Sequence, residues 1–147
     1  MSRRTVIRAF VPAVVMSAAL AYLYDPPWIA GMTTGFHRWE QHAAGFPFRW
    51  TNGHASFFVL ADASTLTIPM RAAFSGPEGA PVIVKVSVDD RWLADVVLDD
   101  PDAWVRPRFP MPRTRAHRRY RRVDVRVNRV RTEGNLGIQV GRVLVER

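Results

Sequence analysis

Acidic residues offer the first candidate chemistry, because carboxylates bind calcium and act as general acids or bases. Five aspartates fall within a short stretch: Asp89, Asp90, Asp99, Asp100 and Asp102. Their order lacks the D-x-D-x-D-G spacing of a calcium loop, and aspartate is typical of β-turns. A small secreted hydrolase or calcium-dependent enzyme using the 89–102 acidic turns therefore stays an alternative. The leading prediction contains no catalytic residue, no metal site and no cofactor.

The histidines, serines and cysteines show no pattern of catalysis or metal binding. His37 and His42 are five positions apart, whereas a helical zinc pair is spaced by four. No serine stands in a G-x-S-x-G context. The chain has no cysteine, which excludes disulfides, thiolate catalysis and Cys-ligated zinc or iron–sulfur sites.

Aromatic side chains offer a binding chemistry, because their flat apolar faces stack on sugar rings and carry a polar edge. Trp50 and Trp92 lie in strand-like segments, and we expect them to pack in the core. Trp39 lies in a connector and Trp104 beside an acidic turn, so both are better placed for exposure. Together with Tyr120, these two are the candidate ligand-binding residues for a glycan.

Arginine is concentrated in one segment. Residues 113–131 hold nine arginines against one acidic residue, Asp124, whereas residues 78–102 hold seven acidic residues against Lys85 and Arg91. Arginine binds phosphate and carboxylate through two parallel hydrogen bonds, so the run predicts an anion site for lipid headgroups or a phosphate-bearing polymer. A solvated loop and an Arg-rich nucleic-acid binder are the alternatives. The candidate anion-binding residues are Arg113, Arg115, Arg118, Arg119, Arg121 and Arg122.

The N-terminal segment combines a basic start with an apolar run. Three arginines within the first eight residues precede 9–24, which carries no charge. One interpretation is a cleaved signal peptide, with Ala19-Leu20-Ala21 as the small-x-small site. The other is an uncleaved signal anchor, with Tyr22 and Tyr24 at the membrane interface. We expect a single-pass membrane protein whose C-terminal domain lies outside the cytoplasm, or a secreted or periplasmic one if cleavage follows Ala21.

The remainder of the chain alternates with the period of β-strands. Four valines share one face of Val82–Val88, and Val123, Val125 and Val127 are expected to face inward, with Arg122, Asp124 and Arg126 outward. Asn52-Gly53 is typical of a hairpin turn, and Pro69 indicates a strand edge or bulge.

About eight short strands separated by turn residues predict an all-β fold, an antiparallel, jelly-roll-like β-sandwich preceded by an N-terminal apolar helix. The predicted division is a signal anchor or signal peptide over 1–24, a connector over 25–47 and the β-sandwich domain over 48–147. A short helix near 36–42 is expected within the connector.

Several segments together resemble a known group of proteins. These are Phe48-Arg49-Trp50-Thr51, His54–Val59, Leu66–Arg71, Pro81–Asp89, Trp104 and Leu136–Gly141. Over about residues 24–146 the chain resembles the small β-sandwich modules of bacterial membrane glycosyltransferase-like proteins and their small membrane-anchored relatives. The resemblance implies an extracytoplasmic, non-catalytic role associated with the cell envelope, and it implies no functional residues.

Taken together, these patterns predict a non-catalytic extracytoplasmic module. We expect it to attach to the membrane through its N-terminal segment. Its expected partner is a cell-envelope glycan, an anionic polymer or a membrane protein. Nucleic acid is not an expected partner, because export would separate the arginine run from it.

Overall fold

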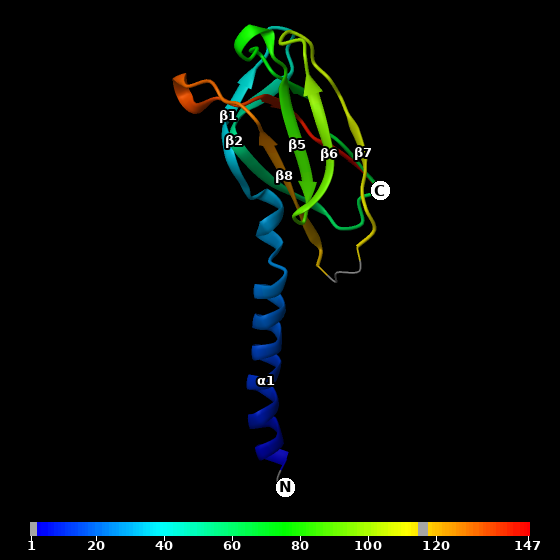
Figure 1. Ribbon diagram of the computed structural model, residues 1–147. Helices are drawn as coiled ribbons and strands as arrows, with labels where there is room; N and C mark the ends of the chain where they lie inside the picture. The colour runs from blue at the N-terminus through cyan, green and yellow to red at the C-terminus, as the bar shows by residue number, and fades with distance from the viewer. Residues whose placement is uncertain (1–2, 115–117) are drawn as a thin grey trace.

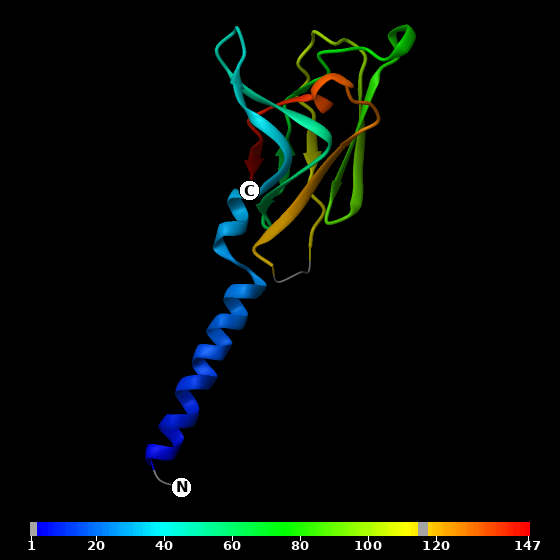
Figure 2. The same cartoon turned by 90° about the vertical axis from the view of Figure 1, so that its left-hand side faces the viewer.

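The computed structural model describes residues 3–114 and 118–147 and consists of one long helix and a β-sandwich body (Figures 1 and 2). Helix α1 (Arg3–Tyr24) projects from one end of the body. It ends where Asp25 precedes Pro26 and Pro27, because a residue before proline is disfavoured in the helical conformation. The short 3₁₀ helix η1 (Pro27–Gly31) then leads into the body. Within the described residues, no helix has the length and apolar character needed to cross a membrane.

The body is built from two antiparallel sheets. The larger has the strand order β4–β9–β2–β8–β5–β6, with β1 also paired to β2, and the smaller has the order β10–β3–β7. The strands are β1 (Thr33–Gln41), β2 (Pro47–Leu60), β3 (Thr65–Thr67), β4 (Met70–Arg71), β5 (Val82–Val88), β6 (Arg91–Leu98), β7 (Arg108–Pro110), β8 (Tyr120–Val127), β9 (Gln139–Gly141) and β10 (Leu144–Glu146). Two further 3₁₀ turns are η2 (Pro77–Gly79) and η3 (Glu133–Asn135). The predicted antiparallel β-sandwich preceded by a helix is confirmed, with ten strands in the described residues rather than about eight.

Side chains from both sheets share one hydrophobic core. The four valines at alternate positions of β5 are fully buried, as are Val123 and Val125 of β8. Leu66 of β3 and Phe109 of β7 bring the smaller sheet into the same cluster. The period-two alternation of β5 therefore identified its buried face correctly, because successive side chains of a strand point to opposite faces.

Pro69 marks the point where the chain changes sheets. Strand β3 before it pairs with β10 and β7, and strand β4 after it pairs with β9. The carbonyl of Pro69 accepts a hydrogen bond from the N–H of Gly141 at 2.9 Å. Proline has no N–H to donate to a ladder, so it suits this interruption. A strand edge or bulge was predicted here, and the structure instead has a break between β3 and β4.

The predicted turn at Asn52-Gly53 is wrong. Strand β2 runs unbroken through this dipeptide, because β1 pairs with it on both sides, Thr33 with Phe57 and Phe36 with Thr51. The pairing slips between these two points, at a bulge that contains Gly35. A Cβ at Gly35 would lie 1.9 Å from the carbonyl oxygen of His54, so only glycine fits this crossing.

The expected short helix near 36–42 is also wrong. Residues 33–41 form strand β1, which pairs with β2 as far as Gln41 opposite Pro47. The larger sheet therefore takes in part of the predicted 25–47 connector. The cause is long-range pairing, since the backbone of β1 forms its hydrogen bonds with β2 rather than with nearby residues of the same segment, as a helix would.

Gly137 lies where the chain leading into β9 crosses β2, and it provides a test of this close approach. Its N–H donates to the carbonyl of Thr51 at 2.6 Å, and a Cβ there would meet Thr51 Oγ1 at 2.5 Å and the Asn52 carbonyl oxygen at 2.6 Å. We expect Gly137→Ala to lower the free energy of unfolding by about 2–4 kcal/mol, because the two backbones must separate. Urea denaturation measures this loss.

Gly31→Ala is the matched control, since a Cβ at Gly31 has no atom within 4 Å. We expect it to change stability by less than about 0.5 kcal/mol. Equal, small effects at the two positions would show that the β2 crossing tolerates a side chain.

Candidate functional site

The first candidate site is an aromatic groove beside Trp104. It has a volume of about 260 Å³ and is lined by Phe46, Pro47, Pro69, Trp104, Arg106, Gly141, Arg142 and Leu144. The rings of Phe46, His42 and Phe48 all pack roughly edge-to-face against the indole of Trp104, with centroids 5.0, 6.1 and 6.2 Å away. Such edge-to-face contacts are favourable for aromatic pairs, so the indole is held as a rigid wall of the groove.

The charged residues that line the groove are two arginines. Arg106 and Arg142 are both exposed, and no carboxylate among the described residues pairs with either. The indole N–H of Trp104 is buried with no hydrogen-bond partner in the described part of the chain. Because most buried polar groups are paired, this N–H is an exception. The groove itself combines an apolar wall with two guanidiniums that have no carboxylate partner among the described residues.

A polar network around Arg71 fixes the residues that surround the groove. The Arg71 guanidinium donates to Asp102 Oδ1 at 2.8 Å and to the Pro101 carbonyl at 2.8 Å, and it lies 3.3 Å from His42 Nε2. The His42 ring in turn stacks on Phe46, with centroids 4.5 Å apart. The 99–102 acidic turn therefore positions the loop between β1 and β2, which carries two of the aromatic residues around Trp104.

The other aromatic candidates lie in different surroundings. Trp39, on β1, is about half exposed, and the Arg49 guanidinium lies 4.8 Å from its ring. Burial lowers the pKa of Arg49 from its ordinary value. Trp50 is partly buried, but Trp92 is 64% exposed and donates its indole N–H to Asp95 at 3.0 Å. The expectation that Trp92 packs in the core is therefore wrong, because it lies on the outer face of β6.

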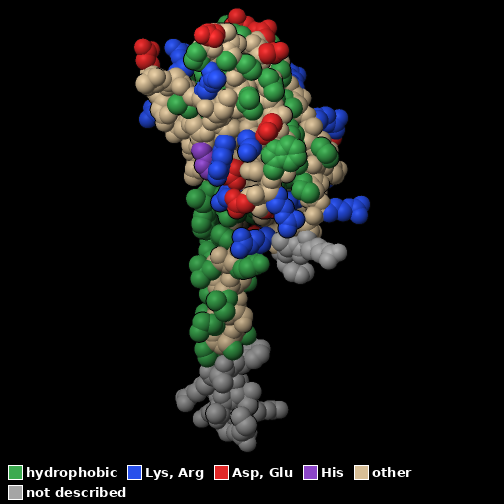
Figure 3. Space-filling model, viewed as in Figure 1, with side chains coloured by type: hydrophobic (Ala, Val, Ile, Leu, Met, Phe, Trp, Pro, Cys, Tyr) green, Lys and Arg blue, Asp and Glu red, His purple; other side chains and the backbone are tan. Residues whose placement is uncertain are grey.

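The second candidate site is an arginine cleft at the α1 end of the body. It has a volume of about 530 Å³ and is lined by Asp89, Arg91, Arg113, Thr114, Arg118, Tyr120 and Arg121. Basic side chains gather at this end of the body, next to α1 (Figure 3). The structure thus brings the ligand candidate Tyr120 together with three of the predicted anion-binding arginines and adds Arg91.

The remaining predicted arginines have other roles or positions. Arg122 binds Asp124 and Asp90, and the N–H of Arg119 donates to Asp25. Arg119 itself lines a separate hollow beside Asp62 and Arg147. Arg115 lies outside the described residues. Within the cleft, Arg121 is buried and bound to Asp89 at 2.8 Å, so its charge is neutralised.

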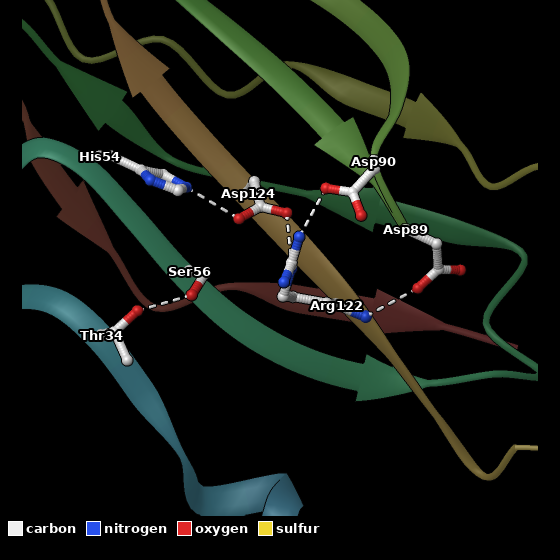
Figure 4. Close-up of polar contacts among 7 residues, drawn as sticks. All are labelled: Thr34, His54, Ser56, Asp89, Asp90, Arg122 and Asp124. Atoms are coloured by element: carbon white, nitrogen blue, oxygen red, sulfur yellow. Dashed lines mark hydrogen bonds and ion pairs between the residues drawn. The ribbon is translucent and has the colours of Figure 1, made fainter.

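A buried carboxylate lies at the centre of the network in Figure 4. Asp124 has 1% exposure, and its two oxygens bind His54 Nε2 at 2.8 Å and Arg122 Nε at 2.9 Å. The hydrogen bond to Asp124 is the main cause that raises the pKa of Arg122. Asp124 alternates with the core residues Val123 and Val125 and so lies on the predicted outward face of β8. It is nevertheless buried, because His54 and Arg122 bind it from neighbouring positions on the sheet. Ser56, on the same face, bonds to Thr34 at 2.7 Å instead of to His54.

The two acidic turns lie at opposite ends of β6. Asp89 and Asp90 precede the strand and Asp99, Asp100 and Asp102 follow it, so about 25 Å of extended chain separates them. Asp89 and Asp90 bind arginines of β8, and Asp102 binds Arg71. No group of three or more potential metal ligands occurs among the described residues. The 89–102 aspartates therefore do not form the single cluster that a calcium-dependent enzyme would need.

Several residues of the aromatic groove were not predicted from the sequence. Phe46, Arg106 and Arg142 come from three connections that meet only in the folded body. The one local signal was the pair of phenylalanines in Phe46-Pro47-Phe48, at the start of β2. The meeting of Arg91 with Arg113, Arg118 and Arg121 in one cleft has no local signal, because it depends on β5 lying between β6 and β8.

No protein-family model and no curated protein matches this chain. Among solved structures, it is similar to the C-terminal domain of the sugar-binding protein EclA, with 14% identity, a TM-score of 0.47, and 62% of this chain aligned to 64% of that one. The chain thus spans less than two thirds of that relative.

It is also similar to two family 35 carbohydrate-binding modules. One, from an environmental isolate, has 15% identity, a TM-score of 0.47 and coverage of 77% of this chain and 87% of that one. The other, from Clostridium thermocellum, has 10% identity, a TM-score of 0.46 and coverage of 76% and 88%. Likenesses at this level assign neither a ligand nor a site residue to this chain. The resemblance to glycosyltransferase-associated modules stays a prediction.

The network of Figure 4 leads to a prediction about stability. We expect Asp124→Asn to lower the free energy of unfolding by about 2–4 kcal/mol, because His54 and Arg122 both lose a charged acceptor in a buried setting. Chemical denaturation measures the effect. Glu133→Gln is the control, since the Glu133 side chain is 93% exposed and 4.0 Å from Arg131. Equal stabilities of the two variants would mean that the Asp124 network contributes little.

Proposed function

We propose that this chain is a non-catalytic carbohydrate-binding module that acts in the cell envelope, outside the cytoplasm, and holds a sugar ring bearing a carboxylate in the aromatic groove. The observation that carries the proposal is the placement of the Trp104 indole, held by three aromatic rings, beside two exposed arginines that have no carboxylate partner among the described residues.

The chemistry of the groove selects the ligand class. An indole wall favours a flat ligand with an apolar face, such as the C–H face of a sugar ring. A guanidinium has five N–H donors and no acceptor, so Arg106 and Arg142 require a ligand rich in acceptors. A carboxylate matches a guanidinium through two parallel, charge-assisted hydrogen bonds. An acidic sugar satisfies both requirements in one ring.

The same residues favour binding over hydrolysis. Glycosidic hydrolysis uses a pair of carboxyl groups that exchange protons with the ligand and with water. Arg106 and Arg142 are the charged residues of the groove, and guanidiniums stay protonated at physiological pH. They can hold and orient a charged sugar but cannot act as its general acid or base.

The proposed location rests on the N-terminal segment. Three arginines followed by the uncharged run 9–24 match an export signal or signal anchor. Export would bring the body to the compartment that contains envelope polysaccharides. Attachment to the membrane through the same segment is part of this proposal.

Binding of matched sugars tests the proposal. We expect a glucuronate-containing oligosaccharide to bind more tightly than its glucose counterpart. The double variant Arg106→Gln, Arg142→Gln should weaken glucuronate binding about 10-fold or more and leave glucose binding nearly unchanged, because only the carboxylate contacts are lost. Trp104→Ala should weaken both by about 10- to 100-fold, since the stacking wall is removed. Isothermal titration calorimetry gives these affinities.

The controls use residues of the same types elsewhere. The double variant Arg91→Gln, Arg113→Gln removes the same charge from the arginine cleft, and Trp92→Ala removes another exposed indole. Neither should change sugar affinity by more than about 3-fold. If they weaken binding as much as the groove variants, or if the groove variants bind normally, the groove is not the site.

A further inference from the structure

We propose that the end of the body next to α1 docks onto an anionic phospholipid surface and that the arginine cleft receives lipid phosphates. The docking surface comprises three exposed arginines, Arg91, Arg113 and Arg118, and three exposed aromatic side chains, Tyr22, Tyr24 and Trp28. The loop between β1 and β2, which borders the aromatic groove, lies at the other end of the body (Figure 2). The proposal therefore stands independently of carbohydrate binding.

The net positive charge of the cleft favours an anionic ligand. Among the described residues, four arginines and one carboxylate line it, and that carboxylate, Asp89, is bound to Arg121. Arg91, Arg113 and Arg118 have no carboxylate partner among the described residues. Three unneutralised guanidiniums around one cleft form a site for phosphate oxygens, which guanidiniums bind through paired hydrogen bonds.

Two contacts hold the cleft against the end of α1. The Arg118 guanidinium lies 5.3 Å from the centroid of the Tyr24 ring, within the range of a cation–π interaction. The backbone N–H of Arg119 donates to Asp25 Oδ2 at 3.0 Å. These contacts join Arg118 and Arg119, before β8, to Tyr24 and Asp25 at the end of the helix. The basic cleft and α1 can therefore contact the same partner.

The helix identifies that partner as a lipid surface rather than a soluble polyanion. Hydrophobic side chains line much of the described part of α1 in Figure 3. The large apolar side chains of residues 11–24 are all exposed: Val11, Val14, Val15, Met16, Leu20, Tyr22, Leu23 and Tyr24. An apolar surface of this extent is normally covered by a partner or a membrane. A soluble polyanion would neutralise the arginines and leave the helix in water, whereas anionic lipid covers both.

The aromatic residues at the junction support the same partner. Tyr22, Tyr24 and Trp28 are each more than half exposed and lie within the last turn of α1 and the start of η1. Tyrosine and tryptophan are enriched where membrane hydrocarbon meets water, because their rings are apolar and their edges polar. Their position between the apolar helix and the basic cleft matches this boundary.

Vesicle partition of the full chain tests the proposal. The measured quantity is the ratio of its partition into mixed phosphatidylglycerol–phosphatidylcholine vesicles to that into phosphatidylcholine alone, which separates charge from apolar insertion. Each arginine near an anionic surface contributes about fivefold, so the variant Arg91→Gln, Arg113→Gln, Arg118→Gln should lower this ratio by roughly 100-fold.

The control variant Arg38→Gln, Arg106→Gln, Arg142→Gln removes the same net charge from exposed positions outside the cleft. It should lower the ratio by less than about fivefold. An equal loss in both variants, or no loss in the cleft variant, would overturn the proposal. So would binding to soluble polyphosphate as tight as binding to the mixed vesicles.

The aromatic junction gives a second readout. Trp28→Ala should lower partition into both kinds of vesicle by a similar factor of roughly ten, because the ring contributes apolar burial and no charge. Trp39→Ala, which removes an exposed indole from β1, should leave both partitions unchanged. A loss confined to the anionic vesicles, or equal losses in the two variants, would remove the junction from the docking surface.

Discussion

Strand β2 hydrogen-bonds to three other strands, and the positions of both sites follow from this. One edge of β2 pairs with β1 from Pro47 to Phe57, while its other edge pairs first with β9 and then with β8. Thr51 lies at the change of partner, where its backbone and hydroxyl bind the backbone of Gly137 and Ile138. A fully buried Thr with these groups satisfied can occupy the junction, because buried polar groups cost free energy only when unpaired. The loop before β2 then reaches Trp104, and β8 begins near α1.

The acidic residues neutralise selected arginines and leave others available. At the α1 end, Asp89 binds Arg121 and Asp90 binds Arg122, and these pairs hold the turn before β6 against β8. At the other end, Asp102 binds Arg71 and supports the loop around Trp104. The folded body is therefore not uniformly basic despite its net charge of +8. Among the described residues, exposed guanidiniums without a carboxylate partner remain at both the cleft and the groove, where they can bind an external anion.

The positions of the two sites are compatible with one orientation of the body at a membrane surface. A body docked through its α1 end would hold the arginine cleft against lipid and direct the loop between β1 and β2 away from it (Figures 1 and 2). The aromatic groove would then face the polymer beyond the membrane. The physical basis is the separation of the two kinds of surface, since apolar helix and unpaired arginines meet at one end and the rigid indole wall lies toward the other.

The sequence alone determined the features that depend on neighbours along the chain. The valine alternation of β5, the acidic turns that flank β6 and an irregularity of the strand at Pro69 were predicted, because side-chain period, turn propensity and proline chemistry are local properties. The exposure of Trp39 was also predicted, although it was placed in a connector and the structure puts it on β1. Only the tertiary structure decided that Asn52-Gly53 stays extended, since β1 pairs across it, and that Asp124 is buried between His54 and Arg122. It also decided which arginines stay free, because that depends on which carboxylates the strand order brings within hydrogen-bonding distance.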